Sequence, residues 1–423
     1  MLKIKNKFNY PSNLFETNEF IYKLAGVWIP DKSYNLFIRI IYFFYVTVFY
    51  GTGVYFLICE YMILNETVKN INTFVGHIGM LLTHTVGILK FYILVFGRKK
   101  IQRIMDMLKD DQYYYETVDN FSPAQFLNEG KKLSTKFSVL LFVMYSFAGI
   151  LSHTSSLMVI NTEIKGDNFL ETNKTCQDFM PFFFYIPFNT DKKWQCELAF
   201  TFMDISFGIF AWLIACHDGL YVALLNFLRC QLIILGHVFR SIRLRSLLAL
   251  NLPKKFKVFS DKDHPEIESE MYKQLTHYTA HLKVLLKARD EIEDMFSFVI
   301  LCQTVACLFI YSSALYNISK TPIGSTEFFV QLEYFICILL ELALICWFGN
   351  EITIASELIR LSLYESDWLS SSTRFKKSLI LTMTRMQRPI YLTIGKFSRL
   401  TLATLVAVFR GSLSYFALFQ SIQ

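Results

Sequence analysis

The chain has 423 residues, of which 53% are hydrophobic and 18% are charged, with 42 phenylalanines and 23 tyrosines. A soluble domain of this size needs more charge to cover its surface, so this composition excludes an ordinary water-soluble fold. The net charge of +7 would suit a nucleic-acid partner, but the basic residues gather in the gaps between apolar blocks. We therefore interpret them as signals of membrane topology and expect no nucleic-acid binding.

Seven apolar blocks are each long enough to cross the hydrocarbon core of a bilayer, which takes about 20 helical residues. They cover residues 36–63, 71–96, 137–160, 198–228, 295–318, 328–348 and 400–419. We therefore expect an all-α integral membrane protein with seven transmembrane helices. The chain then divides into segments 1–35, 36–228 with helices one to four, 229–294, 295–356 with helices five and six, 357–399, and 400–423 with the last helix.

Lysine and arginine are distributed unevenly between the gaps. Segments 1–35, 97–135, 229–290 and 357–399 hold 32 of them, whereas the alternate gaps hold 6. Loops rich in lysine and arginine remain in the cytoplasm. The distribution therefore predicts a cytoplasmic N-terminus and, after seven spans, an extracellular C-terminus.

Two of the predicted cytoplasmic segments carry helical patterns. Between residues 267 and 296, apolar side chains recur at helical spacing with charges between them. A second basic helix is predicted over 372–387, and Pro389 breaks it, because proline lacks a backbone donor and clashes with the preceding turn. We expect helices four to seven to extend below the membrane, and the seventh element to consist of two helices.

The predicted extracellular gaps contain features of exported loops. Asparagine sequons at Asn65, Asn173 and Asn317 lie in or beside these gaps, so we expect glycosylation there. Cys176 and Cys196 fall in one such loop, where oxidation is chemically possible. The sequence leaves open whether the two cysteines form a disulfide.

No motif of a catalytic or cofactor centre occurs in the chain. The sequence contains no HExxH, no GxSxG, no Walker-type glycine loop and no dinucleotide-binding glycine fingerprint. His77 and His84 share a helical face, but two turns separate them, which is too far for one zinc ion. We therefore expect no enzymatic activity, no metal and no cofactor.

The C-terminal part of the chain carries a specific combination of motifs. These are Tyr364-Glu-Ser-Asp-Trp368, the run 382–389, Gly395 and the closing run 410–416. The region of the fourth span adds the run 185–188, Asp218 and the run 231–235. Together with the length and the inverted seven-helix topology, this combination resembles the insect odorant receptors.

The resemblance implies a ligand-gated, nonselective cation channel that assembles as a tetramer in the plasma membrane of olfactory neurons, in particular their dendrites. An odorant-binding subunit pairs there with a shared co-receptor subunit to form a heterotetramer. The last helix would line the pore. The cytoplasmic ends of helices four to seven, about 229–294 and 357–395 here, would form the anchor between subunits.

One departure from the family pattern classifies the chain further. The co-receptor and the related gustatory receptors end in a tyrosine followed six residues later by glutamine, whereas here Ser421 occupies that offset from Tyr415. This favours the odorant-binding subunit. Two alternatives stay open: a gustatory-type channel of the same architecture, and a seven-helix receptor coupled to G proteins.

The family places its odorant pocket in the outer half of the membrane, among helices two, three, four and six. A pocket for a small volatile hydrophobic odorant should be mostly apolar, with few polar groups. Ordinary packing is the alternative role for each residue on the matching faces. Those residues are His77, Met80, Leu81 and His84; Phe147, Ile150, Leu151 and Thr154; Phe200, Met203, Asp204 and Phe207; Phe329, Gln331, Leu332 and Phe335.

The resemblance also suggests a gate in the last helix. Leu418, three residues after Tyr415, falls at the hydrophobic gate position of the family, and Ser421 shares its helical face. A ring of apolar side chains can stop ions by excluding water. The alternative is that Leu418 packs against a neighbouring helix.

Charged residues inside the apolar blocks need partners or water. For Asp204 a polar role in the pocket and a structural salt link both stay open, and His77 or His84 is its candidate partner if the second and fourth helices touch there. For Lys90 we expect a side chain that extends to the headgroups. For Arg410 we expect an ion pair with Glu341 rather than a position beside the ion path, where a bare arginine would repel cations.

Overall fold

The computed structural model describes residues 10–27, 35–163, 175–254 and 263–421. Within them, seven helices are long and apolar enough to cross a membrane, each containing most or all of one predicted block. This confirms an all-α membrane protein with seven spans. The helices are α3 (Leu36–Thr67), α4 (Ile71–Phe96), α6 (Pro123–Glu163), α7 (Lys193–Arg240), α9 (Pro265–Lys320), α10 (Thr326–Glu365) and α12 (Leu402–Ser421).

Local side chains fix where several spans begin. The side chains of Asn35 and Asn70 accept hydrogen bonds from the backbone two residues ahead, at the starts of α3 and α4. The Ser325 side chain accepts from the backbone three residues ahead at the start of α10, with its hydroxyl oxygen 3.1 Å from the Phe328 nitrogen. Pro265 occupies the first turn of α9, where a helix needs no backbone donor. These caps satisfy backbone groups that a helix end leaves without intrahelical partners.

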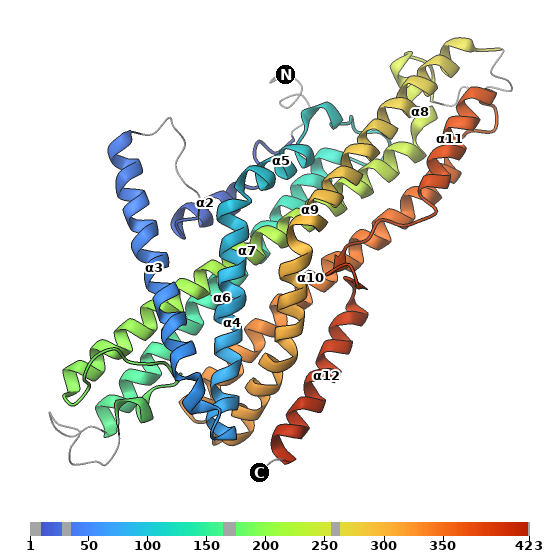
Figure 1. Cartoon of the computed structure of the whole chain (residues 1–423). Coiled ribbons are helices and arrows are strands. Elements are labelled where there is room, and N and C mark those ends of the chain that lie inside the picture. Colours follow the sequence, from blue (N-terminus) through green and yellow to red (C-terminus); the bar gives the residue numbers. More distant parts are fainter. Residues whose placement is uncertain (1–9, 28–34, 164–174, 255–262, 422–423) are drawn as a thin grey trace.

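Three spans are far longer than a bilayer requires. α7 has 48 residues, α9 has 56 and α10 has 40. At 1.5 Å per residue, α9 alone is about 84 Å long, against a hydrocarbon core of about 30 Å. Figure 1 shows the surplus gathered at one end of the bundle, beside α8 (Ile242–Ala249) and α11 (Thr373–Arg385). The extensions predicted for the fourth, fifth and sixth helices are thus present as helical continuations of α7, α9 and α10.

The seventh element consists of two helices, as predicted. α11 ends at Arg385, four residues before Pro389, and α12 begins at Leu402. A short antiparallel hairpin of β1 (Thr393–Ile394) and β2 (Ser398–Arg399) connects them. Gly395 in its turn has φ +59°, and a Cβ there would lie 2.5 Å from the side chain of Leu301 on α9, so only glycine fits.

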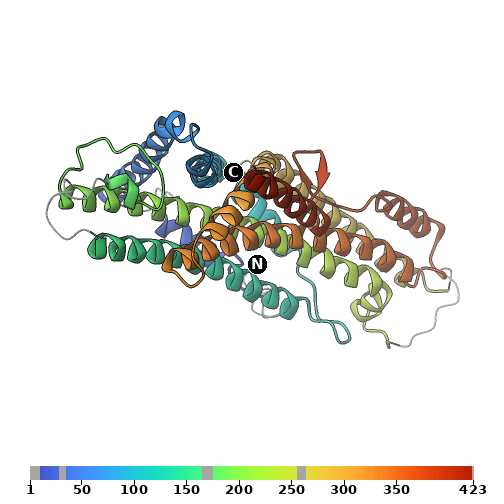
Figure 2. The same ribbon diagram turned by 90° about the horizontal axis from the view of Figure 1, so that it is seen from below.

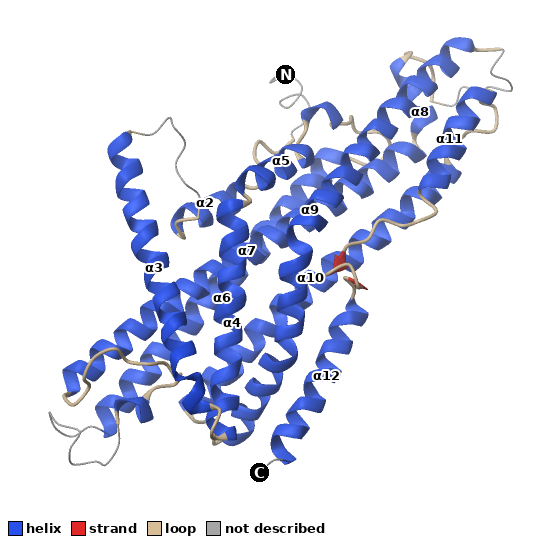
Figure 3. Ribbon diagram, in the orientation of Figure 1, coloured by secondary structure: helices blue, strands red, loops and turns tan. Residues whose placement is uncertain are grey.

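α7 forms the centre of the bundle. It packs against α6, α10, α9 and α4, and its side chains are buried almost continuously from Ile209 to Phe239. Figure 3 shows how completely helices make up the fold, with α2 (Glu16–Leu24) and α5 (Arg98–Leu108) beside the spans. The described chain begins and ends at opposite ends of the bundle, as an odd number of spans requires (Figure 1).

α3 and α12 lie at the periphery of the subunit. α3 exposes Phe43 and Phe44, and α12 exposes Val406, Leu413 and Leu418. Figure 2 shows α12 lying along one side of the bundle, where it contacts α9 and α10. Apolar side chains exposed at this density call for lipid or a neighbouring subunit around the helix.

Candidate functional site

An aromatic cluster occupies the half of the bundle that the charge distribution assigns to the outside. We call it the outer cluster. It joins α3, α4 and α7 to the segment that follows the short helix η3 (Cys176–Phe179). A disulfide between Cys176 and Cys196, the pairing that the sequence left open, ties that segment to α7. The buried members are Phe56, Cys59, Met80, Cys176, Met180, Phe182, Phe184, Cys196, Ala199, Phe200, Met203 and Phe210.

The structure buries the predicted pocket residues of α4 and brings Met80 together with the predicted apolar residues of α7. His77, Met80, Leu81 and His84 are all buried, as are Phe200 and Met203. Phe207 packs partly buried against the cluster, and its ring stacks on Phe182 with centroids 5.7 Å apart. Met80, Phe200 and Met203 thus belong to one apolar cluster between the two helices, and Phe207 packs against it.

The predicted residues on α6 and α10 lie differently. Phe147 is 53% exposed, Ile150 62% and Phe329 52%, and Thr154 is also exposed, so these four point away from the bundle. The remaining four, Leu151, Gln331, Leu332 and Phe335, are half-buried. The structure therefore does not bring all four predicted faces around one space.

The two histidines of α4 have partners that the sequence analysis did not foresee. His84 Nδ1 lies 2.8 Å from the carboxylate of Glu60 on α3, and its ring stacks on Phe210 at 4.3 Å. His77 Nδ1 lies 3.1 Å from the hydroxyl of Thr67, also on α3. Glu60 interrupts the first apolar block, and this buried acid was the signal that a partner exists on a neighbouring helix.

The expected pairing of Asp204 with His77 or His84 is wrong. Asp204 forms its ion pair with His153 on α6. Successive residues of a helix are turned by about 100°, so Asp204 lies on a different face from Met203, which packs in the outer cluster. The sequence placed both residues on the same span, but only the rotation of α7 decides which neighbour each one meets.

A buried polar network lies deeper in the bundle, below the outer cluster. Lys90 Nζ on α4 lies 2.8 Å from Asp218 on α7 and also contacts Glu341 on α10. Glu341 further accepts hydrogen bonds from Gln303 on α9 and Tyr145 on α6, each at 2.6 Å. Five of the seven spans thus meet at one carboxylate–ammonium centre.

This network corrects two expectations. Lys90 is only 1% exposed, so it does not extend to the headgroups. Glu341 pairs with Lys90 rather than with Arg410, which is exposed on α12. The sequence did contain a signal for this network, since a lysine and two carboxylates occur in three different apolar blocks. Charges of opposite sign are stable in hydrocarbon only when they form pairs.

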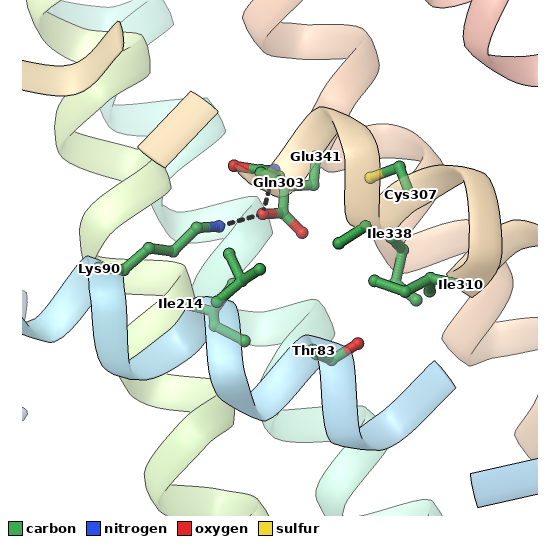
Figure 4. Close-up of a pocket in the computed structure, with 10 residues that line it drawn as sticks. Thr83, Lys90, Ile214, Gln303, Cys307, Ile310, Ile338 and Glu341 are labelled. Atoms are coloured by element: carbon green, nitrogen blue, oxygen red, sulfur yellow. Dashed lines mark hydrogen bonds and ion pairs between the residues drawn. The ribbon is translucent and has the colours of Figure 1, made fainter. Parts of the chain in front are cut away.

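A small cavity of about 20 Å³ adjoins the network, between α4, α7, α9 and α10. Figure 4 shows Lys90 and Gln303 both directed at the carboxylate of Glu341, with Ile214, Ile310 and Ile338 around the rest of the space. Drug-sized ligands usually occupy about 300–1,000 Å³, so this cavity has room for ordered water and not for a larger ligand unless side chains move.

α12 packs on α9 through small residues. The Ser312 hydroxyl on α9 donates to the Ser412 carbonyl at 2.8 Å, and a Cβ added at Gly411 would lie 2.9 Å from Leu308. The predicted gate residue Leu418 lies two turns beyond Gly411 on α12 and is 49% exposed, and Ser421 is exposed as well. Within the described subunit, α12 therefore packs on α9 around Gly411 and Ser412 and leaves Leu418 available to other chains.

The predicted glycosylation sites lie near one end of the bundle. Asn65 is exposed close to the end of α3, and Asn317 is half-buried close to the end of α9. A hydrogen bond from Tyr316 to Asn72 joins that end of α9 to the start of α4. Asn173 lies outside the described residues.

Comparisons with known proteins agree with this architecture. The sequence profile of a family described as 7tm Odorant receptor matches residues 70–413. Putative odorant receptor 92a of Drosophila melanogaster is 21% identical over 78% of this chain and 75% of its own length. Odorant receptor Or1 of Anopheles gambiae is 19% identical over 85% of this chain and 83% of its own length.

Other matches are shorter in sequence or concern the fold. Odorant receptor 2a of Drosophila melanogaster is 27% identical, but the match covers 35% of this chain and 38% of that relative. The solved structure of the olfactory receptor OR5 from Machilis hrabei in complex with eugenol superposes with a TM-score of 0.77 at 12% identity, over 97% of this chain and 98% of that one. This likeness establishes a common fold. Since the family profile covers most of the chain, the protein belongs to the insect odorant receptor family.

Proposed function

We propose that this protein is the odorant-binding subunit of an odorant-gated, nonselective cation channel in the plasma membrane of olfactory neurons. The observation that carries the proposal is the family match over residues 70–413, together with a fold shared along the whole chain with an insect olfactory receptor. Membership of the odorant receptor family favours this function over the gustatory-type channel and over the receptor coupled to G proteins.

The ligand in this proposal is a small volatile hydrophobe. It binds against the face of α4 and α7 that carries Met80, His84 and Met203, beside the aromatic rings of the outer cluster. Aromatic and methionine side chains suit such a ligand, because dispersion and shape discriminate without many hydrogen bonds. Rings of the cluster pack against one another, as Phe182 does on Phe207, so binding in this proposal displaces some of these side chains.

A short chain of contacts supports coupling between this region and the last helix. Gly79 on α4 lies against Ser313 on α9, where an added Cβ would be 2.2 Å from the serine hydroxyl. The adjacent Ser312 holds α12 through the Ser412 carbonyl. A ligand that displaces α4 therefore acts on α9 at the position where α9 holds α12. Only a higher affinity for the open arrangement can make that displacement open a pore.

The pore in this proposal is formed by α12 from four subunits, with Leu418 at the gate and a co-receptor as partner. The exposed apolar face of α12 supports this assembly, because lipid or a neighbouring chain must cover it. The test is an odorant panel applied to cells that express this chain with and without a co-receptor, read as current under voltage clamp. Odorant-evoked current that needs both subunits supports the proposal. A panel-wide absence of current despite surface expression of both subunits contradicts it.

A further inference from the structure

A cavity on the cytoplasmic side of the bundle collects three arginines. It lies between α9 and the connection from α11 to β1, and its volume is about 550 Å³. None of the lining side chains is acidic. They are Arg289, Thr384, Arg385, Gln387, Arg388, Pro389, Ile390 and Tyr391. A cavity of this volume falls within the range of sites that hold small molecules, and its charge calls for an anion.

The wall that carries Arg385 and Arg388 is held in place by backbone hydrogen bonds. At the end of α11, the Met386 nitrogen donates a hydrogen bond to the Thr382 carbonyl at 3.1 Å. Four residues later, the Ile390 nitrogen donates to the Ser356 hydroxyl of α10 at 2.6 Å. The segment between them is therefore fixed at both ends, and the two guanidinium groups are presented from a preformed support.

The arginines are poorly neutralised by the described part of the chain. Arg289 has an ion pair with the adjacent Asp290 at 3.0 Å, but its Nε is buried without a hydrogen-bond partner among the described residues. Arg385 and Arg388 are exposed, and no described carboxylate pairs with them within 4.0 Å. A cation at the C-terminus of α11 stabilises the helix dipole, which accounts for Arg385 alone.

The depth of the cavity places it beside the membrane surface. Arg289 precedes Met295, the first residue of the apolar part of α9, by about 9 Å of helix rise. A headgroup layer adds about 5–7 Å to each side of the hydrocarbon core. Tyr391 in the cavity wall carries the guanidinium of Arg399 over its ring at 4.6 Å, and Phe397 of the hairpin is 87% exposed. Aromatic rings beside arginines at this depth are typical of contact with the membrane interface.

We propose that this cavity binds the phosphorylated headgroup of an anionic lipid from the cytoplasmic leaflet. Guanidinium groups recognise phosphate by paired hydrogen bonds, and Arg289, Arg385 and Arg388 line this cavity. A phosphomonoester brings up to two negative charges to three cations, and the acyl chains stay in the leaflet. The site is separate from the outer cluster and involves neither odorant nor gate, and it lies in the ranges 229–294 and 357–395 that the resemblance assigns to the anchor between subunits.

The experiment measures binding of fluorescent dioctanoyl phosphatidylinositol bisphosphate to the purified full-length chain in detergent. The double variant Arg385→Gln/Arg388→Gln should bind about 10- to 30-fold more weakly, since each surface arginine contributes roughly 1 kcal/mol to such contacts. The matched control is Lys376→Gln/Lys377→Gln, which removes the same charge from α11 away from the cavity. It should bind within twofold of the parent chain.

Two further measurements test whether the arginines form paired hydrogen bonds and whether the site selects a phosphorylated lipid. Arg385→Lys/Arg388→Lys preserves the charge, so a monodisperse preparation that still binds several-fold more weakly supports paired hydrogen bonds over simple attraction. Dioctanoyl phosphatidylcholine should not compete with the fluorescent lipid for binding.

If the glutamine variants of the arginine pair and of the lysine pair bind the lipid equally weakly, the proposed site is wrong. Inositol trisphosphate binding as tightly as the lipid would overturn the lipid assignment. If Arg385→Gln/Arg388→Gln binds the lipid as the parent chain does but assembles poorly with other subunits, the lipid assignment fails. The cavity would then bind an acidic segment of a neighbouring subunit.

Discussion

The ammonium group of Lys90 on α4 lies 2.8 Å from the carboxylate of Asp218 on α7, and both side chains are 1% exposed. Glu341 joins them from α10. Burying an unpaired charge costs far more than burying a matched pair. The three residues therefore fix the positions of α4, α7 and α10 relative to one another below the outer cluster.

Removing the lysine should destabilise the whole bundle. Lys90→Met leaves two carboxylates buried without their cation, at a cost of about 3 to 5 kcal/mol. We expect strongly reduced surface expression, measured by surface biotinylation, and a lower unfolding temperature of the purified chain. Lys69→Met, at an exposed lysine between α3 and α4, is the control and should behave as the parent chain. Parent-like expression of Lys90→Met would show that the network is dispensable.

The disulfide should stabilise the outer cluster. Cys176 and Cys196 are 20 residues apart, and closing a loop of that size stabilises a fold by about 3 kcal/mol. Cys176→Ser, Cys196→Ser and the double variant should lower the unfolding temperature by similar amounts, because either change breaks the same bond. Cys302→Ser, at a half-buried free cysteine, is the control. Parent-like unfolding of the double variant after non-reducing purification would contradict this prediction.

Shortening the proposed gate residue should make the closed state leak. Leu418→Ala replaces a long apolar side chain with a short one and so widens the proposed constriction. A wider constriction presents a lower barrier to water and ions. Expressed with a co-receptor, this variant should show a severalfold higher basal current under voltage clamp. Leu413→Ala removes a similarly exposed leucine from another face of α12 and serves as the control. If both variants match the parent current, Leu418 only packs against a neighbour.

Acidification should destabilise the first half of α9 and its contacts through His281. Its imidazole is buried between Tyr113, stacked at 4.2 Å, and Tyr115, whose hydroxyl lies 2.9 Å away. Burial, and to a smaller extent the nearby His277, lowers the pKa of His281 to about 3. A histidine with a depressed folded pKa contributes full stability above its unfolded pKa of about 6.5, and this stability falls as the pH drops toward the folded pKa.

Lowering the pH from 7 to 5 should therefore cost about 2 kcal/mol through this residue. The measurement is the unfolding temperature of the purified chain at both pH values, compared with that of His281→Gln. The variant should lose less stability on acidification than the parent chain, even though its stability at pH 7 is lower. An identical loss in both would assign the pH dependence to other groups.

Local sequence signals predicted most of the fold, because membrane helices depend on local properties. An apolar run long enough for the bilayer must be helical to satisfy its own backbone, so α4 begins and ends where its apolar block does. The break before α12 followed from Pro389, which lacks a backbone donor. The hairpin of β1 and β2 was not predicted, since four strand residues leave almost no pattern and Gly395 alone marked the turn.

The candidate site was predicted less well, because a site depends on how helices rotate against one another. The sequence placed Met203 and Asp204 on one span, yet Met203 packs in the outer cluster and Asp204 meets His153. Phe147 matched a family pocket face but points outward here. A helical wheel gives relative angles within one helix, and nothing within a single span fixes which neighbour it faces.

By itself, the sequence determined that this chain is a seven-span membrane protein and indicated its family, because hydropathy and the signature of residues 364–416 are read along one segment at a time. Only the tertiary structure decided that Lys90, Asp218 and Glu341 meet, and that three arginines line one cavity. The physical reason is that partners for buried charges come from different helices. Their distances therefore depend on how the whole bundle packs.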